Sequence, residues 1–550
     1  MKTLFAFLLT IVSYTSPVSY EMTLAGNFGE PRPNHFHGGI DVKTDRAEGK
    51  IVRSIGDGYV CRISVDVAAF GKALYIRHPE GYTSFYAHLK EYTPEIEALV
   101  KKQQYLQRSY SVDFDVSASQ LPVAQGQIVA VSGNSGASQA PHLHLEILDN
   151  KTGNMLDPLE FLGDCLKDHV PPVANAIMVY PQAGKGVFNG DARKKIFNFT
   201  SGKNIASDMS AWGKVGFAIR ADDYMEYSGG NKYGVRHLRL LVDGVEVYSS
   251  NVNDIPLRCN RMVNSWSDFE YYQRTHLWFL KSFKEPGNSL PFLVVDDNRG
   301  IVNFAEERDY HFRYILSDYF GNTSEYTFTV RGKKSEIPAY HRPTGSFVLR
   351  YDRGHVFVAG KSVLTIPQGL LADDTELIPD ITQHHHSYSS LYRFSRRVLP
   401  LFNWATLSIS PNRQVAHPEK LYIVSPSWNN RFMGGTYANG RVTARVRNLE
   451  QSYCLDYDDC PPAVSLRTAA LGSSRPVLTV RAEDGKSGMA SLEGYIDDHF
   501  VLFEPRFASH DYVCDLRKTP IRPTRKKRML RIKAVDNRDN ESNITIPIQF

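Results

Sequence analysis

Short runs of alternating apolar and polar residues, separated by glycine-containing turns, dominate the first 170 residues of the chain. Successive side chains of a strand point to opposite faces, so this alternation predicts half-buried strands. The clearest runs are Gly58–Val65, Ala73–His78, Thr83–Leu89, Gln127–Gly133 and His142–Leu148. Because turn residues follow at short intervals, the pattern predicts an antiparallel sheet.

One stretch between these runs has the features of a helix. Thr93 is a suitable N-cap, Pro94 fits the first helical position, and Ile96, Leu99 and Val100 share one helical face. The sequence therefore predicts a helix-bearing insertion at about residues 92–121, beside the histidine-bearing strands.

The sequence pattern in the remainder of the chain also predicts strands. The stretches "LSDYFGNTSEYTFTV" (316–330) and "LRIKAVDNRDNESNITIPIQF" (530–550) share an order of alternating strand, Asp/Asn turn and alternating strand. This order resembles the last hairpin of immunoglobulin-like sandwiches. Proline pairs at 171–172 and 461–462 are typical of domain joints. We expect a mainly β protein: an N-terminal antiparallel β-sheet domain, then about three β-sandwich (immunoglobulin-like) domains. The predicted bounds are 20–168, 169–335 (β-sandwich), 336–458 (β-rich) and 459–550 (immunoglobulin-like).

The first residues have the pattern of a secretory signal peptide. An early lysine precedes the apolar run Leu4–Val12, and small residues follow it. The run is too short to span a bilayer, and we expect no transmembrane segment elsewhere. We therefore predict a signal peptide over residues 1–19, cleaved between Ser13 and Tyr20. The protein would then be exported, to the periplasm or the extracellular side of the cell envelope.

Length, charge and cysteine content narrow the function. A chain of 550 residues is too long to fold around one hydrophobic core, so its length agrees with several domains. The net charge of +5 is mild, and we expect no nucleic-acid partner. The six cysteines lack CxxC spacing, so a thiolate zinc site is not expected. Pairing of Cys454 with Cys460 or with Cys514 stays open. The sequence has no Walker loop, dinucleotide fingerprint or nucleophile elbow.

Four histidines and one aspartate stand out in the N-terminal domain. His142 and His144 are one residue apart on a predicted strand, so both point to the same face. In "NHFHGGIDV", an extended run would also bring His37 and Asp41 to one face. His88 lies near the end of an aromatic strand. Catalytic zinc takes three N/O ligands and keeps one position for water. Two histidines and one aspartate provide such a set, and two histidines remain for proton transfer.

The motifs of this domain resemble the lysostaphin-like, or LytM-type, zinc metallopeptidases that cut peptide cross-links in bacterial peptidoglycan. The stretches "FGEPRPNHFHGGIDV", "GDGYVCRI", "AFGKALYIRHPEGYTSFYAHL" and "VAQGQIVAVSGNSGASQAPHLHLEI" occur in the family order over residues 26–148. The resemblance implies one Zn²⁺ per chain, with His37, Asp41 and His144 as metal ligands. It implies catalytic roles for His88 and His142, which would flank the metal-bound water. Ala140 stands where many relatives have glycine, and the 92–121 insertion exceeds that of minimal members.

The resemblance implies an exported zinc metalloendopeptidase that acts on peptidoglycan peptide stems, by analogy as a D,D-endopeptidase. One alternative is a non-catalytic LytM-type regulator that activates a cell-wall amidase. Another is a zinc protease of non-wall protein targets. The C-terminal β-sandwich domains could bind a regulatory or docking protein, or inhibit or target the enzyme.

Other candidate sites are weaker. The histidines at 384–386 lie in a polar stretch without an acidic or cysteine partner, and we interpret them as surface residues. His35 and His78 lie outside the motifs. The basic stretch 522–528 is interpreted as a solvated loop. Asp222-Asp223 and "YDDC" (457–460) lack the spacing of a calcium loop with alternating oxygen ligands.

Overall fold

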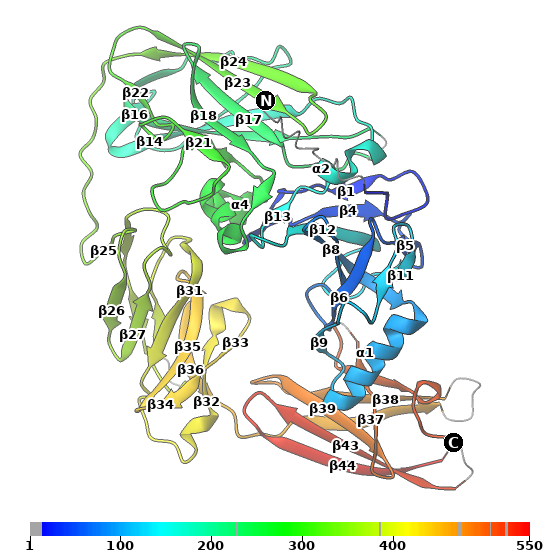
Figure 1. Cartoon of the computed structure of the whole chain (residues 1–550). Coiled ribbons are helices and arrows are strands. Elements are labelled where there is room, and N and C mark those ends of the chain that lie inside the picture. Colours follow the sequence, from blue (N-terminus) through cyan, green and yellow to red (C-terminus); the bar gives the residue numbers. More distant parts are fainter. Residues whose placement is uncertain are drawn as a thin grey trace, which may run out of the picture.

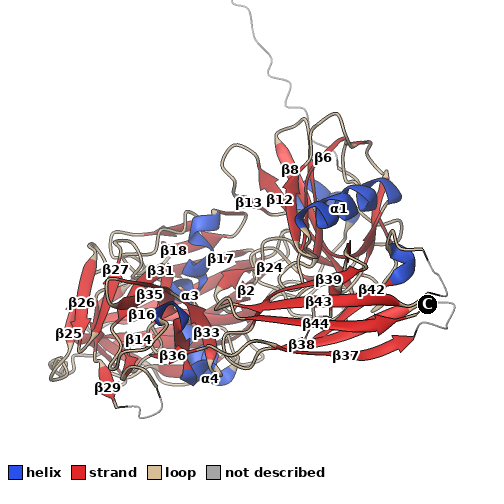
Figure 2. Cartoon of the chain, turned by 90° about the horizontal axis from the view of Figure 1, so that it is seen from below, coloured by secondary structure: helices blue, strands red, loops and turns tan. Residues whose placement is uncertain are grey.

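The computed structural model describes residues 14–226, 229–383, 387–470, 476–506, 508–522 and 526–549. Strands dominate it, as expected, and helices are few in both views (Figures 1 and 2). Along the chain, four β-rich bodies follow one another, and the last lies against the helix of the first (Figure 1). The predicted mainly β fold is confirmed. Among the described residues, no helix has the length and apolar character needed to span a membrane.

The N-terminal body is built on one mixed-length sheet with the order β1-β4-β12-β8-β7-β6-β10. The strands on this path are β1 (Leu24–Gly26), β4 (Ile40–Lys43), β12 (His142–Asp149), β8 (Tyr82–Tyr92), β7 (Lys72–Arg77), β6 (Gly58–Val65) and β10 (Pro122–Val123). Four further strands pair beside it: β5 (Ile51–Arg53), β9 (Val112–Asp115), β11 (Ile128–Ser132) and β13 (Met155–Leu156). The short strands β2 (Pro31–Arg32) and β3 (His35–Phe36) form a separate hairpin.

Strand β12 lies in the interior of this sheet, between β4 and β8. All five strands expected from the alternation are present, within a few residues of the expected ends. On β12, Leu143 and Leu145 are fully buried in the core and the histidines occupy the opposite face. The alternation of apolar residues therefore anchors the strand that presents His142 and His144.

Helix α1 (Pro94–Gln107) lies in the predicted insertion, with Thr93 at the N-cap and Pro94 in the first turn. Ile96 and Val100 are buried against the N-terminal sheet. Further along the helix, Tyr105 packs edge-on against Phe500 of the last body, with ring centroids 5.4 Å apart. Just after the helix, the Arg108 guanidinium donates to the Tyr495 hydroxyl. The insertion thus brings the first and the last body of the chain into contact (Figure 1).

The second body is a sheet with the order β15-β14-β16-β24-β23-β17-β18-β21, folded over an aromatic core. Phe217 of β16 packs on Phe312 of β23 with ring centroids 4.7 Å apart, so the two halves of the sheet face each other. Its strands are β14 (Val173–Phe188), β15 (Lys195–Asn198), β16 (Ser210–Asp222), β17 (His237–Val242), β18 (Val245–Asn251), β20 (Leu280–Lys281), β21 (Leu293–Val295), β22 (Val302–Phe304), β23 (Asp309–Ser317) and β24 (Thr323–Gly332).

A helical excursion from the second body reaches the first. It comprises η2 (Leu257–Met262), α3 (Val263–Trp266) and α4 (Phe269–Thr275). Its Asn260 and Asn264 side chains accept hydrogen bonds from the backbone of the β2–β3 hairpin, at Phe36 and Asn34. Strand β19 (Asp254–Ile255) pairs with β13. The second body therefore supports the segment that leads to His37.

The third body has two five-stranded sheets, as expected of a β-sandwich. One contains β26 (His355–Ala359), β27 (Ser362–Ile366), β31 (Pro400–Ile409), β34 (Thr436–Ala438) and β35 (Arg441–Asn448); the other contains β29 (Asp380–Thr382), β30 (Leu391–Arg393), β32 (Leu421–Ser425), β33 (Arg431–Gly434) and β36 (Ser452–Tyr457). A short pair, β25 (Phe347–Leu349) and β28 (Thr375–Leu377), lies beside them.

The fourth body has two four-stranded sheets. They contain β37 (Ala463–Ala470), β38 (Val477–Glu483), β41 (Glu504–Pro505) and β42 (Asp511–Asp515), and β39 (Met489–Ile496), β40 (His499–Val501), β43 (Arg528–Asp536) and β44 (Glu541–Ile548). Strands β43 and β44 form the final hairpin around an Asp/Asn turn, and β23 and β24 form the matching hairpin of the second body. All six cysteines are free.

Candidate metal centre

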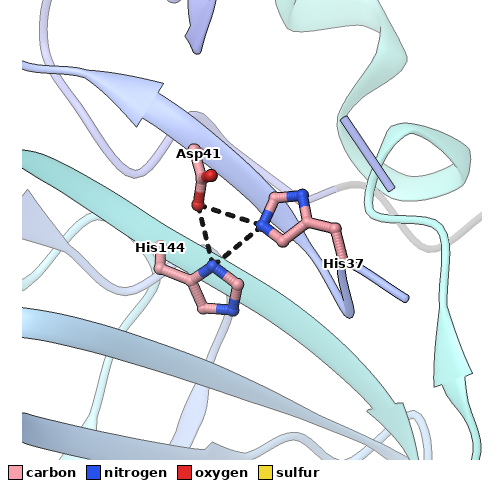
Figure 3. A group of neighbouring side chains, drawn as sticks. All are labelled: His37, Asp41 and His144. Carbon is pink, nitrogen blue, oxygen red and sulfur yellow. Dashed lines mark hydrogen bonds and ion pairs between the residues drawn. The ribbon is translucent and has the colours of Figure 1, made fainter. Parts of the chain in front are cut away.

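Three side chains meet on one face of the N-terminal sheet: His37, Asp41 and His144 (Figure 3). Nε2 of His37 lies 3.0 Å from Oδ1 of Asp41 and 3.1 Å from Nδ1 of His144. Nδ1 of His144 lies 2.8 Å from the same Asp41 oxygen. All three residues are buried. The structure thus brings together the three residues expected to bind a metal.

Strand pairing accounts for two of these positions. Asp41 on β4 and His144 on β12 are direct cross-strand partners, so their side chains leave the sheet on the same face. His37 does not lie in the extended run with Asp41 that the sequence suggested. It precedes β4, in the turn after β3. Gly39 in this turn approaches β12 so closely that a Cβ there would lie 2.1 Å from the Leu145 carbonyl oxygen.

A second set of contacts fixes which atoms face inward. His37 Nδ1 donates to the Asn27 carbonyl oxygen at 2.7 Å, which leaves Nε2 with a lone pair. His144 Nε2 donates to the Glu146 carboxylate at 2.9 Å, which directs Nδ1 toward the group. The Arg32 guanidinium donates to Asp41 Oδ2 at 2.6 Å and leaves Oδ1 for the histidines.

His88 and His142 lie beside this group, with their ring centroids 4.8 Å apart. Each ring is held through Nδ1, which donates to a backbone carbonyl oxygen at 2.8 Å: Ser135 for His88 and Ala140 for His142. Nε2 of His142 lies 3.4 Å from Asp41 Oδ1. All five residues predicted for the site are therefore assembled in one place.

The sequence comparisons agree with this geometry. Residues 35–158 match the family described as Peptidase family M23, and residues 346–458 match the Zu5-like domain family. Residues 35–158 form an M23 peptidase domain. The expected LytM-type fold is thereby confirmed for this part of the chain.

One relative of the M23 domain is an uncharacterized metalloprotease of Haemophilus influenzae, 30% identical over 131 residues. The match covers 24% of this chain and 21% of that relative's length.

Among solved structures, the lysostaphin catalytic domain from Staphylococcus simulans is 23% identical, over 25% of this chain and 89% of that chain, with a TM-score of 0.19. A zinc-containing peptidase from Vibrio cholerae is 24% identical, over 26% of this chain and 39% of that chain, with a TM-score of 0.20.

The inward atoms of the M23 domain form a set that fits a metal cation. Two imidazole nitrogens and one carboxylate oxygen converge. Because the hydrogen bonds on the far side of each group are already made, each converging atom can offer a lone pair to a cation. Three such atoms repel one another unless a proton or a cation lies between them. Nitrogen and oxygen ligands in a group of three are also the set that catalytic zinc uses. The group is therefore compatible with zinc.

The electrostatics of the group indicate where a proton sits when no metal is bound. Burial lowers the pKa of His37 to about 4, so this ring is neutral near pH 7. Burial opposes charge on His144 as well, but hydrogen bonds to Asp41 and Glu146 raise its pKa to about 9. The Asp41 carboxyl is buried, yet the His37 and His142 side chains hold its pKa well below the usual range. A metal must therefore displace the proton of His144.

This displacement predicts that zinc affinity rises with pH. His144 is protonated below about pH 9 and His37 is already neutral above about pH 4. Between these values binding should release about one proton, so the apparent Kd should weaken about tenfold per unit of decreasing pH. Titration calorimetry in buffers of different ionisation enthalpy measures the released proton. A pH-independent Kd between pH 6 and 8 would contradict the assignment of His144.

The sequence did not predict three residues that orient the candidate metal-binding side chains: Glu146 contacts His144, Arg32 contacts Asp41, and Asn27 contacts His37. Glu146 carried a usable signal, because the spacing that pairs His142 with His144 continues to residue 146. His35 is exposed and His78 is buried against Ser84, and both lie outside the group, as expected. The histidines at 384–386 lie outside the described residues.

Loss of Glu146 should weaken metal binding without removing a ligand. We expect Glu146→Ala to reduce zinc affinity about 10–100-fold, because the His144 ring loses the acceptor that fixes its tautomer. Glu146→Gln should lose less, since the amide oxygen still accepts from Nε2. Competition with a chromogenic chelator measures both, with the exposed Glu91→Ala as a matched control on β8. Unchanged affinity in Glu146→Ala would show that His144 needs no such partner.

Proposed function

We propose that the chain is an exported zinc metalloendopeptidase that hydrolyses peptide cross-links of bacterial peptidoglycan. The observation that carries the proposal is that two sets of side chains lie side by side. His37, Asp41 and His144 converge as a candidate metal-binding group, and the histidine pair His88 and His142 lies next to it. A protein that only regulated a partner would need neither set. The chain retains all five residues, and their outer contacts hold them in orientations suited to catalysis.

His37, Asp41 and His144 would hold the zinc ion through Nε2, Oδ1 and Nδ1. When bound, zinc supplies Lewis acidity that polarises a peptide carbonyl and makes water easier to deprotonate at neutral pH. The chain's own residues must then move the proton and stabilise charge.

The pair His88 and His142 is suited to that work. Burial, and to a smaller degree His142, lower the pKa of His88 to about 4, so its ring is neutral and able to accept a proton. The His142 ring is partly exposed, and its Nε2 lies 3.4 Å from Asp41 Oδ1, on the side of the proposed metal group. Either ring could take a proton from water, and the resulting imidazolium could stabilise the oxyanion or protonate the leaving amine.

The second body contributes to positioning. Asn27, whose carbonyl oxygen accepts from His37, is itself tied to Gly234 by two hydrogen bonds. Contacts at Phe36 and Asn34 fix the hairpin just before His37. We infer that removing residues after about 170 would loosen the His37 ligand and not simply uncover the site.

Digestion of purified sacculi by the full chain tests this proposal against the alternatives. Release of uncrosslinked muropeptides that a zinc chelator abolishes is the expected result. Product analysis would identify the bond, with D,D-cleavage of a cross-link distinguished from cleavage of a glycine bridge. No release, but stimulation of a purified amidase, would favour a LytM-type regulator. Cleavage of proteins and not of sacculi would favour a zinc protease of other targets.

The proposed export gives a testable processing site. Residues 1–13 lie outside the described residues, but Tyr14 is buried in the N-terminal core and the Thr15 amide donates to the Ile55 carbonyl oxygen. The Arg53 amide donates to the Pro17 carbonyl oxygen. Cleavage late in the Ser13–Tyr20 window would remove these contacts. We therefore expect the mature protein to begin at or before Tyr14, which shortens the signal peptide predicted over residues 1–19. Intact-mass measurement of the exported chain checks this; a start after Tyr14 would contradict it.

A further inference from the structure

Three aspartates gather where the third body meets the fourth: Asp458, Asp484 and Asp536. One carboxylate oxygen from each lies within 4.8 Å of the others. Asp458 and Asp536 are fully buried, and Asp484 is half-buried. Asp458 directly follows strand β36, Asp484 directly follows β38, and Asp536 is the last residue of β43. The group therefore spans a joint between bodies.

A second aspartate group occupies the equivalent joint, where the M23 domain meets the second body: Asp168, Asp223 and Asp318. All three are buried. Burial and the Asp318 carboxylate raise the pKa of Asp223 to about 8. Burial, together with the Asp168 carboxylate within hydrogen-bond reach, raises the pKa of Asp318. Asp168 and Asp318 therefore lie within hydrogen-bond reach of each other, and Asp223 lies near both, in a looser group than that at the other joint.

The two joints share their surrounding contacts. Asn322 donates to both oxygens of Asp318 and to the Asp168 carbonyl oxygen. Asn540 donates in the same way to Asp536 and to the Asp458 carbonyl oxygen. Beyond them, Ser324 and Ser542 donate to the carbonyl oxygens of Pro172 and Pro462. The same set of asparagine and serine hydrogen bonds therefore occurs at both joints, in the two hairpins whose sequences are alike.

Unpartnered oxygen atoms point to a ligand at both joints. Asp168 Oδ2 and Asp223 Oδ1 are buried without a hydrogen-bond partner. At the other joint, the buried Ser487 hydroxyl also lacks a partner, and the Ser487 amide donates to Asp458 Oδ2 at 3.1 Å. This hydroxyl lies outside the carboxylate group but borders it. Buried carboxylate and hydroxyl oxygens without donors are costly unless a cation binds them.

We propose that each joint binds one divalent cation of the calcium class. Calcium takes six to eight oxygen ligands, and carboxylate, hydroxyl and backbone carbonyl oxygens are available at these joints. Neither group offers the nitrogen or sulfur ligands that zinc prefers, so the joints differ in kind from the M23 site. Each cation would tie an aspartate that precedes a sandwich to two aspartates within it, and so fix the angle between consecutive bodies.

The sequence argument against calcium at Asp222-Asp223 and "YDDC" rested on the spacing of a single loop. That spacing is absent, but the fold brings aspartates together from separate segments: Asp458 converges with Asp484 and Asp536, and Asp223 lies near Asp318 and Asp168. Local spacing could not show this.

Equilibrium dialysis of the zinc-loaded full chain against radioactive Ca²⁺, with Mg²⁺ in excess, tests the proposal. Two bound Ca²⁺ per chain are expected, with Kd values between about 10⁻⁷ and 10⁻³ M. Asp223→Asn and Asp484→Asn should each leave one, and the double variant none. Asp222→Asn and Asp459→Asn, at the neighbouring positions, should keep two. No bound Ca²⁺ in the unaltered chain, or two in the double variant, would overturn the proposal.

Thermal unfolding provides a readout that does not depend on radioactive binding. Ca²⁺ should raise the Tm of the unaltered chain. In Ca²⁺-free buffer near pH 7, Asp223→Asn should unfold at a higher temperature than the unaltered chain. Burial and the Asp318 carboxylate raise the pKa of Asp223 to about 8, so the unaltered chain must take up a proton there on folding, which asparagine need not do. In Ca²⁺ the order should reverse. If Ca²⁺ did not change the Tm of the unaltered chain, both proposed sites would be contradicted, independently of the results for the variants.

Discussion

Asp41→Ala should purify as a folded protein that contains almost no zinc and releases no muropeptides from sacculi. The substitution removes the one anionic side chain of the proposed ligand set and leaves two imidazole nitrogens 3.1 Å apart. It also removes the closer of the two carboxylates beside the Arg32 guanidinium and leaves Glu30 at 3.9 Å, so the positive charge near the site is less balanced and opposes the cation. Metal content by mass spectrometry and the sacculus assay measure the two losses together.

Asp115→Ala is the matched control for this variant. Asp115 is an exposed aspartate at the end of β9 in the same domain. This variant should keep both zinc and activity. An Asp41→Ala protein that is active without zinc would remove the basis for the M23 site as a metal centre.

His142→Ala should separate metal binding from turnover. The ring is outside the three-atom group, so the variant should keep about one zinc per chain. Loss of a proton-transfer group typically costs about 10²–10⁴-fold in rate, and we expect kcat to fall within that range. His88→Ala should behave in the same way, because its ring packs beside that of His142.

The informative comparison is zinc content against rate in the same preparations. Exposed His35, two residues before the proposed ligand His37, offers a matched control, and His35→Ala should retain both properties. If His142→Ala lost zinc in proportion to activity, His142 would act as a ligand and not in proton transfer. Full activity in both His88→Ala and His142→Ala would mean that neither ring takes part.

Much of the site could be predicted because it depends on strand alternation. The period of two sets His142 and His144 on one face, and the leucines between and after them anchor the strand. The same reasoning failed for His37, whose position depends on a turn that two glycines permit. Contacts between separate segments, such as Arg32 with Asp41 or His37 with His144, have no local signature.

His88 illustrates a second limit. It lies within β8, yet its φ is +58°, a left-handed conformation that non-glycine residues rarely adopt. The pairing of β8 with β7 and β11 shifts register around it. This irregularity allows the Ser135 carbonyl oxygen to hold the ring beside His142. Regular alternation would not have predicted it, although the motif resemblance did select the residue.

The larger architecture was predictable in kind but not in arrangement. The helix in the insertion begins where Thr93 and Pro94 predict. Its contacts with Tyr495 and Phe500 could not be foreseen, because they join segments almost 400 residues apart. The paired aspartate groups are similar: each hairpin was visible in the sequence, but the convergence of its aspartate with two distant ones was not.

Zinc add-back to the metal-free full chain, with Ca²⁺ held constant and sacculi as substrate, tests the central claim most directly. Muropeptide release should be absent without zinc, rise in proportion to added zinc, and reach a plateau at one equivalent per chain. Asp41→Ala should stay inactive throughout the titration. Release by the metal-free chain, or a rate that does not respond to zinc, would contradict the account.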